Sequence, residues 1–268
     1  MAAAEGDSRF TTLDDNKIHY VSYGKGKEAI VFIHGWTCDS TFWKTQAPVY
    51  ESRRALLIDL PGHGLSDKPE IPYTMELFAR SVDAVMTAEK VERATLVGHS
   101  MGTPVAAQFL RMHPEKVKAL VIVDGFVPLP AKDETDRIKQ NAYFMGAAKA
   151  IRSPDYMSMT KRMLESMFTK QTDPDLRREI ETKMLAAPQF VMASAMEGMA
   201  GMDPITERYP DLPVAAFMKK RANSAEYETL LKQHFRLLDF REFDAGHFIM
   251  MEQPAKFNQA LLEFLARK

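Results

Sequence analysis

The stretch Ala94-Thr95-Leu96-Val97-Gly98-His99-Ser100-Met101-Gly102 places a serine between two glycines directly after an apolar, β-like run. This pattern is typical of a nucleophile elbow, a sharp strand-to-helix turn that exposes the serine hydroxyl. Such a turn puts Ser100 into a strained backbone conformation, and side chains two residues to either side would collide with the following helix. The five residues Gly98 to Gly102 also fit an ordinary glycine-flanked turn, so the choice between an elbow and such a turn depends on the surrounding sequence.

Segments on both sides of the elbow alternate between strand-like and helix-like patterns. This alternation predicts an α/β fold with a mostly parallel central sheet and helices on both faces. The opening pair of strands flanks Asp14-Asp15-Asn16 and is expected to form an antiparallel hairpin. The expected strands are 10–12, 17–23, 29–33, 55–58, 94–97, 117–123, 213–218 and 237–243, and the expected helices are 40–50, 74–90, 103–112 and 255–266.

The pattern changes between residues 126 and 206, where helical periodicity continues without a convincing strand. We interpret 126–206 as an inserted helical cap, and 1–125 with 207–268 as the core. Ten of the 18 methionines lie in this segment. Flexible thioethers form adaptable apolar surfaces that suit acyl or aryl groups, although ordinary packing of the cap helices accounts for most of them equally well.

A serine nucleophile needs a base, because a free hydroxyl reacts poorly near neutral pH. Among seven histidines, His247 stands out within Asp244-Ala245-Gly246-His247-Phe248, which follows the last expected strand. That position places it at the carboxyl edge of the sheet, where the elbow also ends. We therefore expect His247 to act as the base for Ser100.

Acyl transfer also requires donors for the negative charge that develops on the carbonyl oxygen. The amide of Met101 follows the nucleophile at the start of a helix. A second strand ends in His34-Gly35-Trp36, so the amide of Trp36 is expected to turn toward the same site. Trp36 and Met101 are thus the expected oxyanion hole.

Four stretches together make the chain resemble the α/β-hydrolase superfamily over nearly its whole length. They are His34-Gly35-Trp36, Asp59-Leu60-Pro61-Gly62-His63-Gly64-Leu65-Ser66, Gly98-His99-Ser100-Met101-Gly102, and Gly246-His247 before Glu252 and Pro254. The resemblance implies the α/β-hydrolase fold and a Ser-His-acid catalytic triad. It also implies that the loop from Asp59 to Ser66 is structural, and we give that loop no catalytic role.

The acid of the triad departs from the usual family pattern. Members usually carry it after the seventh strand, yet here Lys219 and Ala222 stand where the pattern has glycine and aspartate. Asp124 ends the sixth strand, as the acid does in haloalkane dehalogenases and cofactor-independent dioxygenases of the superfamily. We therefore expect Asp124 to orient His247. Glu226 is the alternative acid, although its place in Ser224-Ala225-Glu226 suits the first turn of a helix.

These residues predict a serine esterase that acts on small to medium hydrophobic esters without a cofactor or a metal. Phe126, Phe144 and Phe168 are candidate pocket residues. Two alternatives stay open: a cofactor-independent dioxygenase or a perhydrolase or haloperoxidase-like enzyme on the same fold, and a non-catalytic binding module. Aspartate-nucleophile chemistry of the dehalogenase or epoxide hydrolase type is disfavoured because serine occupies the elbow.

Composition narrows the partners further. The chain has 268 residues with 35 basic and 36 acidic side chains, and no basic cluster that would favour nucleic acid. No apolar run reaches the ~20 residues needed to span a bilayer. Cys38 is the lone cysteine, which fits a reducing compartment. We expect a cytoplasmic protein, or an exported one whose leader has been removed, and the sequence specifies no oligomeric state.

Overall fold

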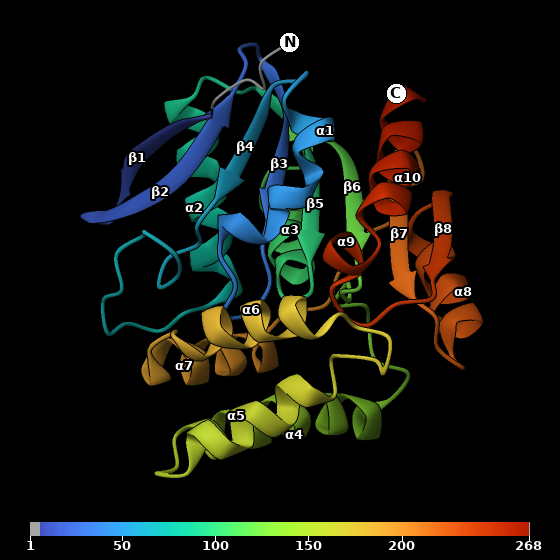
Figure 1. Cartoon of the computed structure of the whole chain (residues 1–268). Helices are drawn as coiled ribbons and strands as arrows, with labels where there is room; N and C mark the ends of the chain where they lie inside the picture. Colours follow the sequence, from blue (N-terminus) through green and yellow to red (C-terminus); the bar gives the residue numbers. More distant parts are fainter. Residues whose placement is uncertain (1–5, 268) are drawn as a thin grey trace.

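The computed structural model describes residues 6–267 and contains one eight-stranded sheet (Figure 1). The strands are β1 (Asp7–Leu13), β2 (Asn16–Tyr23), β3 (Glu28–Ile33), β4 (Ala55–Ile58), β5 (Arg93–His99), β6 (Val117–Val123), β7 (Pro213–Lys219) and β8 (Leu237–Phe243). Their order across the sheet is β1-β2-β4-β3-β5-β6-β7-β8. Strands β1 and β2 pair antiparallel, as do β2 and β4, and every other pair is parallel. The predicted α/β fold with a mostly parallel sheet is confirmed.

The predicted opening hairpin is confirmed, and its turn explains the register of β1 and β2. Asp14 and Asp15 have φ angles of 46° and 64°. Two consecutive left-handed residues form the type of two-residue turn that matches the twist of antiparallel strands. Leu13 therefore lies opposite Asn16, and Asp7 lies opposite Ser22 at the far end of the hairpin.

Helices cover both faces of the sheet. They are α1 (Ala47–Tyr50), α2 (Met75–Ala88), α3 (Gly102–Met112), α8 (Ser224–His234), α9 (Ile249–Glu252) and α10 (Pro254–Ala266). In Figure 1, α2 and α3 lie together behind the sheet, whereas α1 and α10 lie in front of it. Because the central strands β3, β5 and β6 are covered on both faces, they consist of nearly continuous buried apolar residues.

The helix expected at 40–50 is divided into two pieces. Residues Ser40–Gln46 form a 3₁₀ helix, and α1 follows it directly. Pro48 lies in the first turn of α1 and has no N–H to donate, so one continuous α-helical ladder cannot run through this point.

Residues 126–206 contain four helices and no strand: α4 (Glu134–Ile151), α5 (Tyr156–Glu165), α6 (Pro174–Leu185) and α7 (Gln189–Ala200). They lie beyond the carboxyl ends of the parallel strands (Figure 1). The exact domain boundaries at 125/126 and 206/207 stay a prediction. Within residues 6–267, no helix combines the length and the apolar character that crossing a bilayer requires.

Candidate active site

The turn between β5 and α3 holds Ser100 with a φ of 51°, in the left-handed region that L-residues rarely adopt. Both flanking glycines are required by close backbone contacts. A Cβ on Gly98 would lie 2.4 Å from the Gly102 carbonyl oxygen, and a Cβ on Gly102 would lie 2.2 Å from the oxygen of Ile33. The chain therefore has the strained geometry and the steric demand of a nucleophile elbow.

His247 lies in the loop between β8 and α9, and three hydrogen bonds fix its position. Its Nδ1 is 2.6 Å from Oδ2 of Asp124. Its backbone N–H donates to Met167 at 2.7 Å, and its carbonyl oxygen is 3.1 Å from Nε2 of His99. Since Nδ1 is engaged by the carboxylate, Nε2 is the ring nitrogen left to act toward Ser100.

Asp124 directly follows β6 with a φ of 41°, and its side chain is fully buried. Besides His247, it accepts hydrogen bonds from the backbone N–H of Lys219 and from Nη2 of Arg221, each at 3.0 Å. Burial raises the pKa of Asp124, but the hydrogen bond from His247 and the positive charge of Arg221 outweigh burial and leave it lowered. Asp124 is therefore an ionised, well-oriented partner for His247.

Glu226 lies elsewhere, in the first turn of α8. Its exposed carboxylate is 2.5 Å from Nζ of Lys132, and that partner lowers its pKa. Of the two acids proposed from the sequence, the structure brings Asp124 to His247 and pairs Glu226 with a surface lysine. The first turn of α8 is also capped differently from the expectation, because Asn223 precedes the helix and the Ser224 hydroxyl accepts from the Arg221 N–H.

After β3, the carbonyl oxygen of Gly35 accepts two hydrogen bonds, and the N–H of Trp36 points the opposite way. The Gly35 oxygen accepts from Nδ1 of His34 at 2.8 Å and from the N–H of Cys38 at 3.1 Å. Nδ1 of His34 carries the proton because Nε2 accepts from the N–H of Leu60, and burial lowers the pKa of His34. In a trans peptide, the Trp36 N–H points opposite to the Gly35 carbonyl.

Met101 is the other expected oxyanion donor, at the N-cap position of α3. Within the part of the chain that the structure describes, neither its N–H nor that of Trp36 donates to a protein acceptor. A backbone N–H without a protein partner is available to a ligand oxygen. Their role as an oxyanion hole stays a prediction.

Ser100 and His247 line one small cavity of about 10 Å³. This volume holds about one water molecule. Met167 and Met184, two methionines of residues 126–206, line it. The remaining lining residues are Gly35, Trp36, Cys38, His99 and Phe248.

Of the three predicted pocket phenylalanines, none lines this cavity. Phe168 stacks on Phe248, with ring centroids 5.8 Å apart, directly beside it. Phe126 and Phe144 stack on each other at 5.6 Å and line a separate cavity of about 410 Å³. Contact of these three residues with substrate stays a prediction.

Several residues that support the site were not identified from the sequence. Arg221 had no signal, because nothing in its local pattern indicates that it reaches Asp124. His99 lies inside the elbow, and burial together with the nearby His247 lowers its pKa to about 3, so it is a neutral donor. Glu252 accepts from the Gly246 N–H at 3.0 Å and from the Thr172 hydroxyl at 2.9 Å, which joins the His247 loop to the helical segment.

The loop from Asp59 to Ser66 does not contact this cavity and is fixed by its own hydrogen bonds. Asp59 accepts from the backbone N–H groups of Ser40 and Leu65 and from Nδ1 of His19, at 2.6, 2.9 and 2.8 Å. These bonds give it the structural role expected from the sequence.

Comparisons with known proteins find matches over most of the chain. A model of the Alpha/beta hydrolase family matches residues 30–260. A 2-hydroxy-6-oxononadienedioate/2-hydroxy-6-oxononatrienedioate hydrolase from Burkholderia vietnamiensis is 34% identical, covering 94% of this chain and 91% of the relative.

Two solved structures share the fold. A thermophilic esterase from Thermogutta terrifontis superposes with a TM-score of 0.82 and 23% identity, covering 98% of this chain and 99% of the other. An enol-lactonase from Burkholderia xenovorans also superposes with a TM-score of 0.82, at 20% identity, covering 96% and 100% of the two chains.

Proposed function

The chain belongs to the alpha/beta hydrolase family, and we propose that within it the chain is a serine hydrolase that cleaves small to medium hydrophobic carboxylic esters. The observation that carries the proposal is the 2.6 Å contact between His247 and Asp124 beside a serine with a φ of 51°. This arrangement supplies a nucleophile, a base and a carboxylate that orients the base.

In the proposed reaction, Nε2 of His247 takes the hydroxyl proton of Ser100 as its oxygen attacks the ester carbonyl. Collapse of the tetrahedral intermediate breaks the bond to the alcohol, which leaves with the proton from His247. Water then gives a proton to His247 and attacks the acyl-serine, releasing the carboxylic acid and restoring the Ser100 hydroxyl. Asp124 stays ionised and stabilises the imidazolium in both steps.

The negative charge of each tetrahedral intermediate falls on the former carbonyl oxygen. The N–H groups of Trp36 and Met101 would stabilise it, because two preoriented donors need no reorganisation as the charge develops. His34 supports this role by holding the Gly35 carbonyl on the opposite side of the peptide plane.

The cavity size bears on how substrate enters. A space of about 10 Å³ is smaller than an ester, and Met167 and Met184 line it, so we propose that these two side chains move aside as substrate enters. Both residues are flexible thioethers, which favours acyl groups that are apolar and variable in shape.

The proposal is tested with a panel of nitrophenyl esters, thioesters and lactones. The wild-type protein should hydrolyse one or more of them, and Ser100→Ala should lose about 10³-fold or more in kcat. Ser52→Ala, which alters an exposed serine, serves as the matched control and should retain full activity. Undiminished turnover by Ser100→Ala would overturn the proposal.

The alternatives give different results in the same experiment. A dioxygenase or haloperoxidase-like enzyme on this fold would consume oxygen with a hydroxylated heteroaromatic substrate, or peroxide with a halide. A non-catalytic binding module would show no turnover, and Ser100 would fail to react with a fluorophosphonate in the folded protein.

A further inference from the structure

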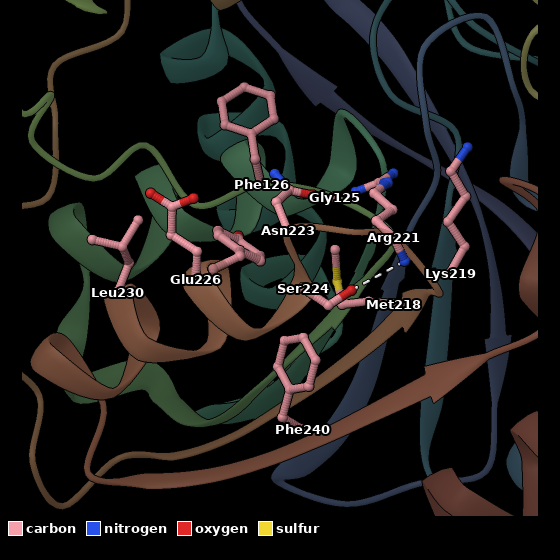
Figure 2. Close-up of a pocket in the computed structure, with 11 residues that line it drawn as sticks. Gly125, Phe126, Met218, Lys219, Arg221, Asn223, Ser224, Glu226, Leu230 and Phe240 are labelled. Carbon is pink, nitrogen blue, oxygen red and sulfur yellow. Dashed lines mark hydrogen bonds between the residues drawn. The ribbon is translucent and has the colours of Figure 1, made fainter.

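Another cavity, of about 270 Å³, lies between the end of β7 and the start of α8 (Figure 2). Gly125 and Arg221 line it, and Ser100 does not. It is much larger than the space beside Ser100, and the proposed reaction makes no use of it.

One part of this cavity is apolar. Met218, Leu230 and Phe240 line it together with the ring of Tyr227, and Phe126 stands on the opposite side from Phe240 (Figure 2). Burial raises the pKa of Tyr227, so its hydroxyl keeps its proton while its oxygen accepts from the N–H of Val127 at 2.9 Å. These surfaces suit a ring or a short alkyl group.

The other part carries positive charge. Arg221 gives Nη2 to Asp124, and within residues 6–267 its Nε and Nη1 have no protein acceptor. Lys219 lines the same edge, and Asn223 lies there at the N-cap of α8 with no side-chain capping bond. Glu226 also lines the cavity, but it lies on the side of Leu230, away from Arg221 and Lys219 (Figure 2), and Lys132 is paired with it.

We propose that this cavity binds a small carboxylate that carries an aromatic or alkyl group, with the carboxylate on Arg221 and the apolar group against Phe240 and Leu230. A guanidinium binds a carboxylate through charge-assisted N–H donors, and the Nε and Nη1 donors of Arg221, which lines the cavity, are not used by Asp124. The combination of a positive edge and an apolar wall selects an amphipathic anion over either a neutral ring or a simple salt ion.

Arg221 also couples this site to the triad. Its charge is shared between Asp124 and the incoming carboxylate, and Asp124 repels that carboxylate. Removing the charge of Asp124 therefore strengthens ligand binding, and by reciprocity the ligand acts on the acid that orients His247.

The test uses phenylacetate as the probe and isothermal titration calorimetry as the readout, in a Ser100→Ala background so that no turnover contributes. Phenylacetate should bind, whereas phenylacetamide and acetate, which each lack one half of the recognised chemistry, should bind at least about tenfold more weakly. Equal binding of phenylacetamide, or no binding of phenylacetate at millimolar concentration, would overturn the proposal.

Variants then locate the site. Arg221→Gln and the cavity-filling Leu230→Trp should each weaken binding about five- to tenfold or more, and Asp124→Asn should strengthen it about threefold or more. Arg236→Gln is the matched control, because Arg236 is an exposed arginine paired with Asp211 and does not line the cavity.

If Arg221→Gln and Leu230→Trp left the affinity for phenylacetate unchanged, phenylacetate would bind elsewhere, for example in the space beside Ser100. That result would contradict the proposal. Circular dichroism of each variant confirms that it is folded. If phenylacetate does not bind here, the proposed esterase activity is not contradicted, because the two proposals rest on different residues and different measurements.

Discussion

Nδ1 of His247 lies 2.6 Å from Oδ2 of Asp124, the residue that directly follows the sixth strand, β6. Residues at and after the end of the seventh strand, β7, supply hydrogen-bond donors instead of the acid. Lys219 donates its backbone N–H and Arg221 its guanidinium to the same carboxylate. The acid is thus held from three sides by groups that favour its ionised form.

If Asp124 orients the base, Asp124→Asn should keep the fold and lower kcat by about 10³- to 10⁴-fold. An amide at this position favours the wrong imidazole tautomer and does not stabilise the imidazolium. Steady-state hydrolysis of a nitrophenyl ester measures the effect.

Glu226→Gln is the control for Asp124→Asn, because it breaks only the surface pair with Lys132. Its activity should match the wild type, since exposed ion pairs contribute little. If Glu226→Gln were inactive and Asp124→Asn active, Glu226 and not Asp124 would be the acid of the triad.

The sequence predicted this acid for a reason that is local. Asp124 follows a continuous apolar run, so its place at the carboxyl edge of a parallel strand could be read from the pattern. Arg221 could not be found in this way, because its contact with Asp124 depends on how the loop after β7 folds back. Pairings between loops that are distant in sequence leave no periodic signal.

The elbow glycines make a prediction about stability. Gly102→Ala should destabilise the protein by about 2 kcal/mol or more, because its Cβ would lie 2.2 Å from the Ile33 oxygen in a rigid strand. Gly146 lies within α4 and has no atom within 4 Å of a built Cβ. Gly146→Ala should therefore stabilise by up to about 1 kcal/mol through helix propensity.

Urea unfolding measures both glycine variants. A Gly102→Ala protein as stable as the wild type would show that the turn is less constrained than its contacts imply.

The elbow was predicted from sequence because its glycines are a steric consequence of the turn itself.

Asp59 makes a prediction about pH. Burial raises its pKa, but the hydrogen bond from His19 and the N–H groups of Leu65 and Ser40 outweigh burial and lower it to about 2. An unfolded aspartate titrates near about 3.9, so this site contributes about 2 to 3 kcal/mol above pH ~4. The contribution is lost as the pH falls through about 2.

The measurement is urea unfolding of the wild type and Asp59→Asn from neutral to acidic pH. Because the folded-state pKa is depressed, the wild type should be more stable near neutrality, and the difference should shrink toward acid. A difference that stays constant with pH would contradict the assignment. Asp83→Asn, at a half-buried surface position beside Lys116, is the control and should change stability little.

We expect Met167 to limit the length of the acyl group that the site accepts. Met167→Ala should widen the space of about 10 Å³ beside Ser100 and raise kcat/KM for longer acyl esters relative to acetyl esters. Met159→Ala removes an exposed methionine of α5 that does not line this cavity, so its acyl preference should not change. An unchanged preference in Met167→Ala would mean that this residue leaves the substrate path during opening.

The residues that line each cavity could not be predicted from the sequence. Phe126 and Phe144, two of the candidate pocket residues, line a different cavity from Ser100. Met167, in the connection between α5 and α6, and Met184, in α6, line the cavity beside Ser100 instead. Helical periodicity predicts that such side chains are buried, but the orientation of one helix on another decides which cavity they face.

The central claim is that Ser100 carries the acyl group during ester cleavage. Rapid mixing with excess nitrophenyl acetate, acid quenching and peptide mass mapping test it most directly. The account predicts a burst of nitrophenol close to one equivalent per active site, and an acetyl group on the peptide that contains Ser100. Turnover with no burst, no acetylated Ser100 peptide and no loss of rate in Ser100→Ala would contradict it.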